Sequence, residues 1–431
     1  MNILLVGSGG REHAFAWKIK QSNLCKKLYI APGNAGTSEL GINLPINVTD
    51  FQNIKDTCIR ESVDLLVVGP EEPLVKGLRN YLSSNPETSH LPIVGPDQLG
   101  ATLEGSKDFS KQFMKANNIP TAGYDTFTED TLNEGLSFIR KQKLPVVLKA
   151  DGLAAGKGVL ICQSYEEAEA SFREMLLEKK FGEASAKVVI EEFLSGIELS
   201  VFVATDGESY KILPEAKDYK RIGEKDTGPN TGGMGAISPV PFADQAFMDK
   251  VEEEIVKPTI EGLKKENIDY RGFLFIGLMN VDGQPKVIEY NVRMGDPETQ
   301  AVLPRIKSDF VALLKAIATK GLANYTLQTE NFVTSTVVMV AGGYPESYEK
   351  GKKITGLHAD NNTSSITFHA GTSLTKDGTV QTNGGRVLGI TGKGKSVEEA
   401  ISNAYERVSQ ISWENVNYRR DIGQDILAYA K

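Results

Sequence analysis

Residues 286–293 read Lys286-Val287-Ile288-Glu289-Tyr290-Asn291-Val292-Arg293, and both the fold and the chemistry can be worked out from this stretch. Apolar and polar residues alternate in it, as they do along a β-strand, so Glu289, Asn291 and Arg293 share one face. Two oxygen donors and a cation on one face are costly in a core, but they suit a hard metal ion bound together with phosphates. We predict a metal site on Glu289 and Asn291, with Arg293 placed to neutralise a transferring phosphoryl group. The alternative is a solvated outer face of the strand.

The regions around this strand predict antiparallel sheets. A preceding strand, residues 272–280, is joined to it by Asp282-Gly283, and strands at 198–205 and 210–214 are joined by Asp206-Gly207. Asp-Gly between two apolar runs is typical of a tight hairpin turn. Helical periodicity is found at 107–117, 165–180 and 244–267. We therefore expect residues 103–325 to form a mixed α+β region.

The first hundred residues follow a different pattern. The apolar runs 3–6, 27–30, 64–68 and 92–94 alternate with amphipathic stretches. This rhythm predicts βαβ units and a parallel sheet, which binds ligands beyond the carboxyl ends of its strands. The tail contains apolar strands at 332–340 and 385–390 and a helix at 397–409. The predicted fold is therefore multidomain α/β and α+β, with an N-terminal parallel α/β domain (1–102), a central domain (103–325) and a small C-terminal α/β domain (326–431).

Composition narrows the class of protein. The 431 residues are 40% apolar and 24% charged, which is ordinary for a globular protein of more than one domain. The net charge of -8 argues against a nucleic-acid binder. Cys25, Cys58 and Cys162 are sparse and far apart, which suits a reducing compartment, and no stretch approaches the ~20 apolar residues of a membrane span. We predict a cytoplasmic protein that binds neither nucleic acid nor membrane.

The first glycine-rich turn, Gly7-Ser8-Gly9-Gly10-Arg11-Glu12, follows a strand and opens a helix. A dinucleotide-binding turn carries glycine or alanine at its sixth position, where this chain has Glu12. Glycines there still let backbone N–H groups approach an anion at the start of a helix, and Arg11 would add a fixed cation. We expect a phosphate-bearing small molecule at this turn. A tight strand-to-helix turn without a ligand is the alternative.

The second glycine-rich segment reads Leu148-Lys149-Ala150-Asp151-Gly152-Leu153-Ala154-Ala155-Gly156-Lys157-Gly158-Val159. A Walker loop needs four residues between its glycines and a hydroxyl residue after its lysine. Here there are three, and Gly158 occupies the hydroxyl position. Apolar runs flank the segment, so we predict a hairpin whose glycine-rich tip folds over a triphosphate. The alternative is a plain surface hairpin.

Two further segments are candidates for nucleotide and polyanion binding. A strand that ends near Glu191 could read the edge of an adenine, with Phe193 and Leu194 as apolar neighbours and Glu198 bound to ribose hydroxyls. Taken alone, this segment is only an acidic edge strand. Residues 218–235 predict a long, basic, glycine-rich loop that suits a polyanion, and a mobile exposed loop is the alternative.

Together these segments resemble the ATP-grasp superfamily of carboxylate–amine ligases and, within it, the glycinamide ribonucleotide synthetase family. The resemblance runs from Val6-Gly7-Ser8-Gly9-Gly10-Arg11-Glu12-His13 to Asn417-Tyr418-Arg419-Arg420-Asp421-Ile422-Gly423, and so covers essentially the whole chain. The segments that carry it in between are 31–37, 103–107, 149–159, 225–235, 289–300 and 368–372. The resemblance implies an N-terminal sheet domain, a central ATP-grasp fold with a lid at about 120–190, and a C-terminal domain.

The resemblance also implies an activity and a site. An enzyme of this family is expected to join glycine to 5-phosphoribosylamine in purine biosynthesis, through a glycyl phosphate, using ATP and Mg²⁺ or Mn²⁺ on Glu289 and Asn291. The residues expected to take part in catalysis are Arg293, Lys149 and Lys157. The residues expected to contact ATP are Lys107, Lys149, Gly152, Gly156, Lys157, Gly158, Glu191, Glu192, Phe193, Leu194 and Glu198. The residues expected at the substrates are Gly9, Gly10, Glu12, Asn34, Glu71, Gly233, Asp296, Pro297, Glu298 and Thr299.

The chain departs from the family pattern in two places. Many ATP-grasp enzymes carry a second acidic metal ligand on the preceding strand, where this chain has Ile276-Gly277-Leu278-Met279, so we expect the metal to rely more on phosphates and water. Tyr219 stands where the family has histidine, which leaves the role of this position open. The rival interpretations are another ATP-grasp ligase acting on a related purine intermediate, and an ATP-sensing module without chemistry. A monomer or a homodimer is expected.

Overall fold

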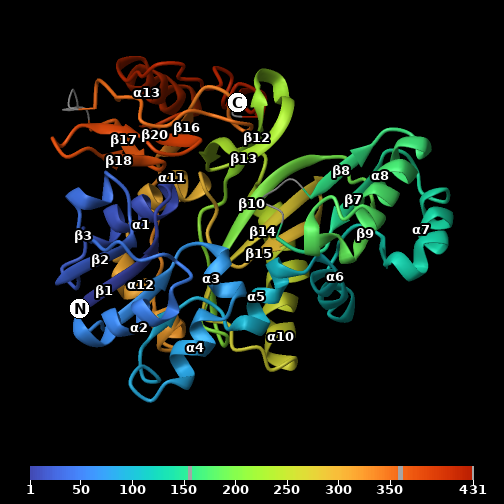
Figure 1. The fold of residues 1–431 in the computed structure, drawn as a ribbon, viewed down its shortest axis with the longest axis horizontal. Helices are drawn as coiled ribbons and strands as arrows, with labels where there is room; N and C mark the ends of the chain where they lie inside the picture. The colour runs from blue at the N-terminus through green and yellow to red at the C-terminus, as the bar shows by residue number, and fades with distance from the viewer. Residues whose placement is uncertain (154–157, 358–362, 430–431) are drawn as a thin grey trace.

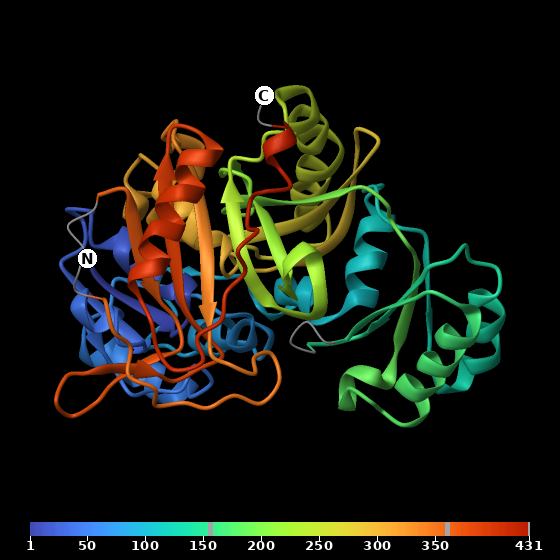
Figure 2. The same ribbon diagram turned by 90° about the horizontal axis from the view of Figure 1, so that it is seen from above.

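The computed structural model describes residues 1–153, 158–357 and 363–429, so Gly156 and Lys157, both expected to contact ATP, lie outside the described residues. Of the four larger sheets, Figure 1 shows three that lie close together and a fourth, formed within residues 124–192, that stands apart at one side. The view from above in Figure 2 shows the same separation.

The N-terminal sheet is parallel, in the order β3-β2-β1-β4-β5, which confirms the predicted parallel sheet. Its strands are β1 (Asn2–Gly7), β2 (Lys27–Pro32), β3 (Ile42–Asn43), β4 (Leu65–Val68) and β5 (Ile93–Val94). The helices around it are α1 (Gly10–Ile19), α2 (Phe51–Arg60), α3 (Glu71–Val75), α4 (Leu78–Ser84) and α5 (Gln98–Gly105). Strand β3 was not predicted, because its residues Ile42 and Asn43 form no apolar run.

Helices cover both faces of this sheet because its strands are apolar on both. Ile3 of β1 packs in one core with Phe15 of α1 and with Phe310, whereas Leu4 packs in the core on the opposite side. Phe310 begins α12 (Phe310–Ala318), and its ring stacks on that of Phe15 with centroids 5.6 Å apart. A helix from far along the chain therefore completes the core of the N-terminal sheet.

The central sheet is antiparallel, in the order β11-β10-β14-β15. Its strands are β10 (Ile197–Thr205), β11 (Tyr210–Ile212), β14 (Gly272–Val281) and β15 (Gln284–Asn291). Its helices are α6 (Lys107–Ala116), α9 (Gln245–Val251), α10 (Lys257–Lys265) and α11 (Glu298–Val302), and a π-helical turn (Glu252–Val256) joins α9 to α10. Both predicted hairpins are confirmed, and φ angles of 50° at Asp282 and 79° at Gly283 are those of a turn that matches the strand twist.

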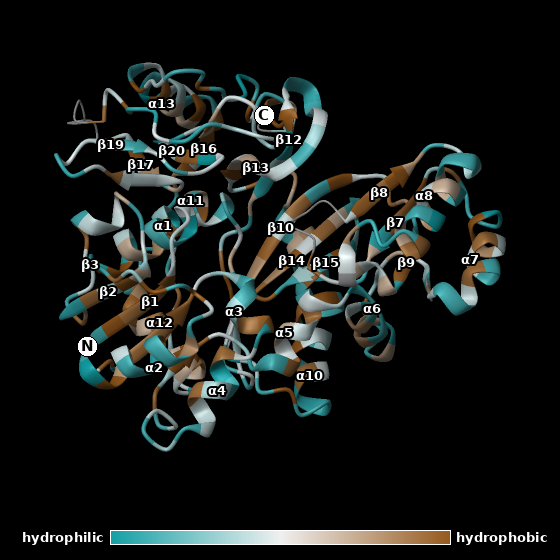
Figure 3. Ribbon diagram, viewed as in Figure 1, coloured by the Kyte–Doolittle hydropathy of each residue, from teal (hydrophilic) through white to brown (hydrophobic). Residues whose placement is uncertain are grey.

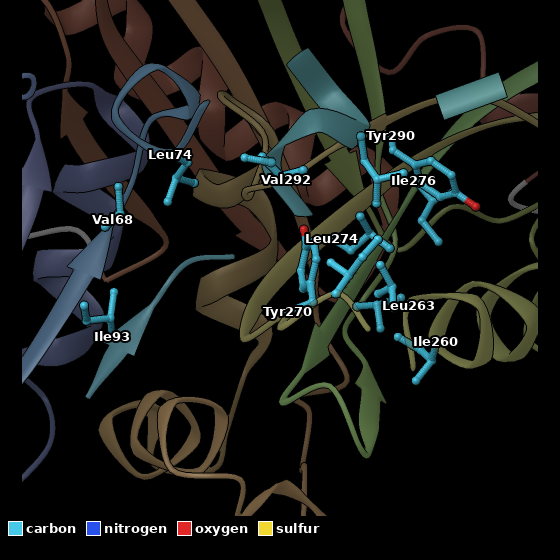
Figure 4. Packing of buried hydrophobic residues seen from close by; sticks show 14 of the residues in the cluster. Val68, Leu74, Ile93, Ile260, Leu263, Tyr270, Leu274, Ile276, Tyr290 and Val292 are labelled. Atoms are coloured by element: carbon cyan, nitrogen blue, oxygen red, sulfur yellow. The ribbon is translucent and has the colours of Figure 1, made fainter. Parts of the chain in front are cut away.

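One hydrophobic core joins the N-terminal sheet to the central sheet. Figure 4 shows Val68 and Ile93 of the first sheet on one side of this core, and Ile276 and Tyr290 of the second on the other. Burial of one such side chain stabilises a fold by about 1.5–3 kcal/mol. The end of β15 is therefore held firmly beside the N-terminal sheet.

The fourth sheet, which we call the lid sheet, has the order β6-β9-β7-β8 with antiparallel neighbours. Its strands are β6 (Tyr124–Phe127), β7 (Val146–Ala150), β8 (Val159–Cys162) and β9 (Val188–Glu192), and its helices are α7 (Leu132–Ile139) and α8 (Tyr165–Leu177). The pairing of β7 with β8 confirms the hairpin predicted at the second glycine-rich segment. The lid sheet has its own core around Phe127 and Phe172, so it packs as a unit of its own.

The C-terminal sheet has the order β12-β13-β16-β20-β17. Its strands are β12 (Lys217–Gly223), β13 (Thr227–Ser238), β16 (Val333–Val340), β17 (Ser365–His369) and β20 (Arg386–Gly394). Helix α13 (Val397–Gln410) covers the sheet, and β18 (Thr372–Leu374) pairs with β19 (Val380–Thr382). The two strands and the helix predicted in the tail are confirmed as β16, β20 and α13.

The prediction that residues 218–235 form a loop is wrong. These residues form β12 and most of β13, which pair with each other, and β13 also pairs with β16. The first half of β13 is exposed and carries no apolar side chain other than Pro229. Backbone hydrogen bonds hold these strands, and such bonds leave no hydrophobic period in the sequence.

Figure 3 shows apolar residues concentrated along the strands of the central and N-terminal sheets, with polar residues on the outward faces of many helices. Within residues 1–153, 158–357 and 363–429, no helix has the length and apolar character that a membrane crossing requires.

Candidate active site

The predicted metal residues lie at the end of β15, next to the N-terminal sheet. Glu289 is paired with Gly277 of β14, and Asn291 with Phe275, so their side chains lie on one face as the alternation predicted. Leu278, next to Gly277, is fully buried, and β14 brings no carboxylate to this face. In the described part of the chain, no cluster of three or more His, Cys, Asp or Glu side chains could hold a metal.

Cationic side chains surround Glu289. Burial alone would raise the pKa of its carboxyl group, but the charges of Lys220, Lys149, Lys107 and Arg293 outweigh burial and lower that pKa. Glu289 is therefore ionised at neutral pH, which is the state that a metal ligand needs.

Asn291 is buried and only partly satisfied. Its Oδ1 accepts a hydrogen bond from Nη2 of Arg293 over 3.2 Å, and its Nδ2 has no partner among the described residues. Nδ2 is a donor and would suit an oxygen of a bound phosphate, whereas Oδ1 is the atom that could bind a metal. Carboxylate and amide oxygens are the donors that Mg²⁺ and Mn²⁺ prefer, so Glu289 and Asn291 fit a divalent cation that also binds phosphates.

Arg293 follows β15 and is held by two carboxylates. Its Nε donates to Oε2 of Glu71 over 3.2 Å, and its Nη2 donates to Oε1 of Glu104 over 2.8 Å. The other oxygen of Glu104 accepts the backbone N–H of Val292 over 2.7 Å. Burial would lower the pKa of the guanidinium group, but Glu104 and Glu71 raise it above its ordinary value. Glu104 was not predicted, because nothing in the sequence points to a partner 189 positions away.

Two lysines converge on Glu191 of β9. Nζ of Lys149 lies 3.0 Å from Oε2 of Glu191, and Nζ of Lys111 lies 3.1 Å from the same atom. Lys149 also donates to the carbonyl oxygen of Ile288 over 3.3 Å and so links the lid sheet to β15. Oε1 of Glu191 is buried and finds no hydrogen-bond partner in the described residues, which leaves it available to a ligand.

Lys107 lies at the base of the lid hairpin. Its Nζ donates to the carbonyl oxygen of Gly152 over 3.0 Å, and Gly152 has a φ of 150°, which favours glycine. The carbonyl oxygen of Gly158 accepts the N–H of Ala150 over 2.8 Å and continues the hairpin. The structure therefore places Lys107 next to the hairpin predicted to cover phosphates, whose tip lies outside the described residues.

Glu198 and Glu289 line the same small cavity, together with Asp218 and Lys220. Nζ of Lys220 lies 2.6 Å from Oε2 of Glu198, and its charge lowers the pKa of that carboxyl group. Burial raises the pKa of Asp218. The cavity therefore joins a predicted nucleotide residue to a predicted metal residue. Asp218 was missed as a site residue, because its segment was expected to be a loop.

Three predicted nucleotide residues lie where the chain passes from the lid sheet to the central sheet. Oε1 of Glu192 accepts the N–H of Gly123 over 3.0 Å and lies 3.7 Å from Nζ of Lys286, so its side chain holds the edge of the lid sheet. Phe193 is 41% exposed and Leu194 is half-buried. The ring of Phe193 therefore exposes apolar surface where the chain crosses between the two sheets.

The first glycine-rich turn has its charges directed inward. Nε of Arg11 lies 2.5 Å from Oε1 of Glu12, and Nη1 donates to the carbonyl oxygen of Met294 over 3.1 Å. Both side chains are buried. Arg11 is therefore a fixed cation, as expected, but Glu12 and the carbonyl group of Met294 already occupy its Nε and Nη1. Oε2 of Glu12 accepts the N–H of Gly9 over 2.7 Å and fixes the turn.

Asn34 connects this turn to the C-terminal sheet. Its Nδ2 donates to the carbonyl oxygens of Ser8 and His369, each over 2.9 Å. The side chain is buried. Asn34 therefore closes the rim of the N-terminal sheet at the point where the C-terminal sheet meets it.

The polar turn after Arg293 lies against the first glycine-rich turn. Oδ2 of Asp296 accepts the backbone N–H of Arg11 over 3.2 Å. A side chain at Gly10 would collide with Gln300, whose Nε2 lies 2.3 Å from the position of the added Cβ. The predicted substrate residues that meet here are Gly9, Gly10, Glu12, Asp296, Pro297, Glu298 and Thr299.

The C-terminal sheet closes the site from the other side. A Cβ added at Gly233 would lie 2.5 Å from Cδ of Pro297, so β13 packs directly on the polar turn. Arg386 of β20 fixes this contact, because its Nη1 donates to the carbonyl oxygen of Gly232 over 2.7 Å and also to that of Asp296. Arg386 was not predicted, since its partners come from distant segments.

Tyr219 has a structural place. It is buried, its hydroxyl group donates to Oδ1 of Asp425 over 2.5 Å, and the hydroxyl oxygen of Tyr219 accepts the N–H of Gly423 over 3.0 Å. Nζ of Lys217 lies 3.8 Å from the centre of its ring. Tyr219 therefore attaches the last described segment of the chain to β12.

Glu298 is buried in the polar turn, and burial together with the charge of Asp218 raises the pKa of its carboxyl group to about 7. The substitution Glu298→Gln should therefore stabilise the protein at pH 8. In the unfolded chain this group has its ordinary pKa. Above pH 7 Glu298 is ionised in both states, and its burial as an anion then lowers the free energy of unfolding by the full amount. The cost falls from pH 7 to about 4.5 and is absent below. We expect the free energy of unfolding to rise by on the order of 2 kcal/mol at pH 8 and much less at pH 5.

Chemical denaturation at both pH values measures this difference. Glu129→Gln, at an exposed position, is the matched control and should change neither value. A loss of stability at pH 8, or the same gain at pH 5, would contradict the raised pKa of Glu298.

Comparison with protein-family models places this geometry in one family. Models of phosphoribosylglycinamide synthetase match residues 1–104 (N domain), 105–299 (ATP-grasp (A) domain) and 334–425 (C domain). The phosphoribosylamine–glycine ligase of Vibrio vulnificus strain CMCP6 is 46% identical over 431 residues, which cover 99% of each chain. That of Escherichia coli strain K12 is 46% identical over 426 residues, which cover 98% of each.

Solved structures agree with this result. The phosphoribosylamine–glycine ligase of Thermotoga maritima superposes with a TM-score of 0.84 at 37% identity, over 98% of this chain and 100% of that one. The biotin carboxylase domain of the Hydrogenobacter thermophilus 2-oxoglutarate carboxylase superposes with a TM-score of 0.71 over 97% of this chain and 91% of that one. At 16% identity it shares the fold alone. The chain belongs to the phosphoribosylglycinamide synthetase family of the ATP-grasp superfamily.

Proposed function

We propose that this protein is an ATP-dependent ligase that joins glycine to 5-phosphoribosylamine, giving glycinamide ribonucleotide, ADP and phosphate in purine biosynthesis. The observation that carries the proposal is the meeting of three elements: the rim of the N-terminal sheet, the polar turn that contains Asp296, and the charged end of β15. An amine bound at the rim would thus lie beside the proposed site of phosphoryl transfer at the end of β15. The rival ligase is disfavoured because all three family models match, and a sensing module would not need Arg293 beside a metal site.

ATP is placed between the lid sheet and the central sheet. Lys107 and Lys149 bring positive charge to this space from the two sides, and the cavity that contains Glu198 and Glu289 lies on the central side. The unpartnered Oε1 of Glu191 would accept the exocyclic amine of adenine. The exposed ring of Phe193 would pack on the base.

Glu289 and Asn291 are the residues that would hold Mg²⁺ or Mn²⁺. A divalent cation bound there supplies positive charge to the phosphate oxygens of ATP. Glu289 stays ionised for this purpose because the surrounding lysines lower its pKa. Because Gly277 of β14 lies opposite Glu289, the site leaves room for phosphate oxygens and water.

The ligation proceeds in two chemical steps. An oxygen of the glycine carboxylate attacks the γ-phosphorus of ATP, and the bond to ADP breaks, which gives glycyl phosphate. The amine of phosphoribosylamine then attacks the carbonyl carbon, the carbon–oxygen bond to phosphate breaks, and the amine loses a proton. Arg293, Lys149 and Lys157 offset the charge that collects during the first step. The amine needs no dedicated base if it arrives neutral.

The two substrates are assigned to neighbouring places. Phosphoribosylamine is placed on the rim formed by Gly9, Gly10, Glu12, Asn34 and Glu71, closed by the polar turn 296–299. Glycine is placed near Arg293 and residues 232–235. Because the buried charges of Arg11 and Glu12 neutralise each other, the rim would bind its ligand mainly through backbone groups and the contacts of the polar turn.

We further propose a cytoplasmic location, a monomeric or homodimeric state, and no binding to nucleic acid or membranes. The proposed domain limits lie at 102/103 and 325/326, and the proposed lid spans about 120–190.

The function is tested by phosphate release. With ATP and glycine alone we expect little release, because glycyl phosphate stays in a closed site, and steady release once freshly generated 5-phosphoribosylamine is added. Colorimetric phosphate detection with product analysis measures this. The same release without the amine, or with unrelated amines, would contradict the assigned substrates.

The matched variant for this test is Arg293→Lys. Lysine keeps a charge between Glu71 and Glu104, whereas alanine would leave the buried carboxylate of Glu104 unpaired and cost about 3–5 kcal/mol of stability. Turnover should fall by about 10²–10³-fold, with ATP affinity changed far less. Equal losses in turnover and ATP affinity would refute the assigned role of Arg293.

The metal assignment predicts that Glu289→Gln weakens Mn²⁺ binding in the presence of ATP by at least about tenfold. Electron paramagnetic resonance titration of free Mn²⁺ measures this without any turnover. Glu129→Gln is the control, because Glu129 is exposed and lies outside the proposed site, and it should leave Mn²⁺ affinity unchanged. Unchanged affinity in Glu289→Gln would remove Glu289 from the metal site.

A further inference from the structure

Lys111 is a buried cation beside the proposed ATP site that the mechanism above does not use. It lies on α6, which Figure 1 shows next to the lid sheet, and its side chain is only 2% exposed. Its Nζ lies 3.1 Å from Oε2 of Glu191. Burying an ammonium group is costly, so its presence here requires a reason.

The side chain of Lys111 is surrounded by groups of the protein itself. Besides Glu191, its Nζ donates to Oγ1 of Thr121 over 2.7 Å, and Oγ1 of Thr121 donates to the carbonyl oxygen of Val287 over 2.6 Å. The ring centre of Tyr124 lies 5.7 Å away. Lys111 therefore connects α6 to the lid sheet and, through Thr121, to β15. In the described structure its ammonium group is thus engaged by protein groups, through which it would act on a ligand.

Glu191 is the residue through which Lys111 can act. Both lysines bind Oε2, and Oε1 is left buried without a partner in the described structure. A carboxylate held by one oxygen presents the other in a fixed direction. A donor such as the exocyclic amine of adenine would satisfy that oxygen, whereas the 6-oxo group of a hypoxanthine base would be repelled.

The two lysines differ in what else they contact. Lys149 also donates to the carbonyl oxygen of Ile288 and contributes to the positive field at Glu289, on the side of the phosphates. The other hydrogen-bond partner of Lys111 in the described structure is the uncharged hydroxyl group of Thr121. Burial lowers the pKa of Lys111 to about 8 although the charge of Glu191 raises it, so the ammonium form prevails at neutral pH. Lys111 is thus the cation that can stay on Glu191 when Lys149 turns toward ATP.

We propose that Lys111 is a positioning residue for nucleotide selection: it holds Oε2 of Glu191, so that Oε1 faces the amine of adenine and Lys149 is free to contact phosphate. The proposal rests on the base-binding role assigned to Glu191 under the proposed function. It requires no contact between Lys111 and the nucleotide.

The test compares ATP with ITP, whose base carries a 6-oxo group and an N1–H where adenine has the 6-amine and an unprotonated N1. The variants Lys111→Met and Lys111→Gln are both measured, so that the test can still be made with one of them if the other does not fold. We expect the KM for ATP to rise about tenfold, kcat to change less than about threefold, and the preference for ATP over ITP to fall about tenfold. A merely structural role would lower kcat and thermal stability and leave the preference intact.

Two further variants separate the possible failures. Thr121→Val removes the other hydrogen-bond partner of Lys111 and should keep the preference for ATP. If it lowers the preference as much as Lys111→Met does, the positioning role is overturned. Glu191→Gln should lower the preference. If it does so while both Lys111 variants keep it, the positioning role fails and the base-binding role stands. If Glu191→Gln itself keeps the preference, the base-binding role fails first.

Discussion

The guanidinium group of Arg293 is the charge on which the geometry of the site depends. It receives Glu71 from α3 and Glu104 from α5, and it donates to Asn291 at the end of β15. Breaking a buried pair of this kind typically costs about 3–5 kcal/mol, so the N-terminal sheet and the central sheet are tied together where the chemistry is assigned. The shared hydrophobic core supplies the bulk of the packing, and these ion pairs fix the direction of the functional groups.

Most of the surrounding structure serves to bring separate segments to this point. Asp296 meets the first glycine-rich turn, Gly233 packs on Pro297, and Arg386 reaches across from the C-terminal sheet. The lid sheet differs, because it has its own core and contacts β15 mainly through polar links such as that between Lys149 and Ile288. A unit held by few apolar contacts can move more easily than the rest, which suits a part that must admit ATP and then exclude water.

Local patterns in the sequence were enough for much of the fold. Alternation placed Glu289 and Asn291 on one face, and Asp282-Gly283 marked a hairpin, because both signals depend on neighbouring residues. Contacts across long separations were not predictable: Glu104 lies 189 positions from Arg293, and the strand pairing of residues 218–235 rests on backbone bonds rather than on a hydrophobic period. The contacts of Arg11 were not predictable for the same reason, since its guanidinium group binds the carbonyl group of the distant Met294.

The central claim is that glycine is activated by phosphoryl transfer to its carboxylate, and isotope transfer tests it most directly. Glycine labelled with oxygen-18 in both carboxylate oxygens is incubated with ATP and freshly generated 5-phosphoribosylamine, and the released phosphate is analysed by mass spectrometry. The account predicts one labelled oxygen in each phosphate and the other in the amide product, because the carbon–oxygen bond breaks when the amine attacks. Phosphate without label would show that the carboxylate is never phosphorylated, and would contradict the account.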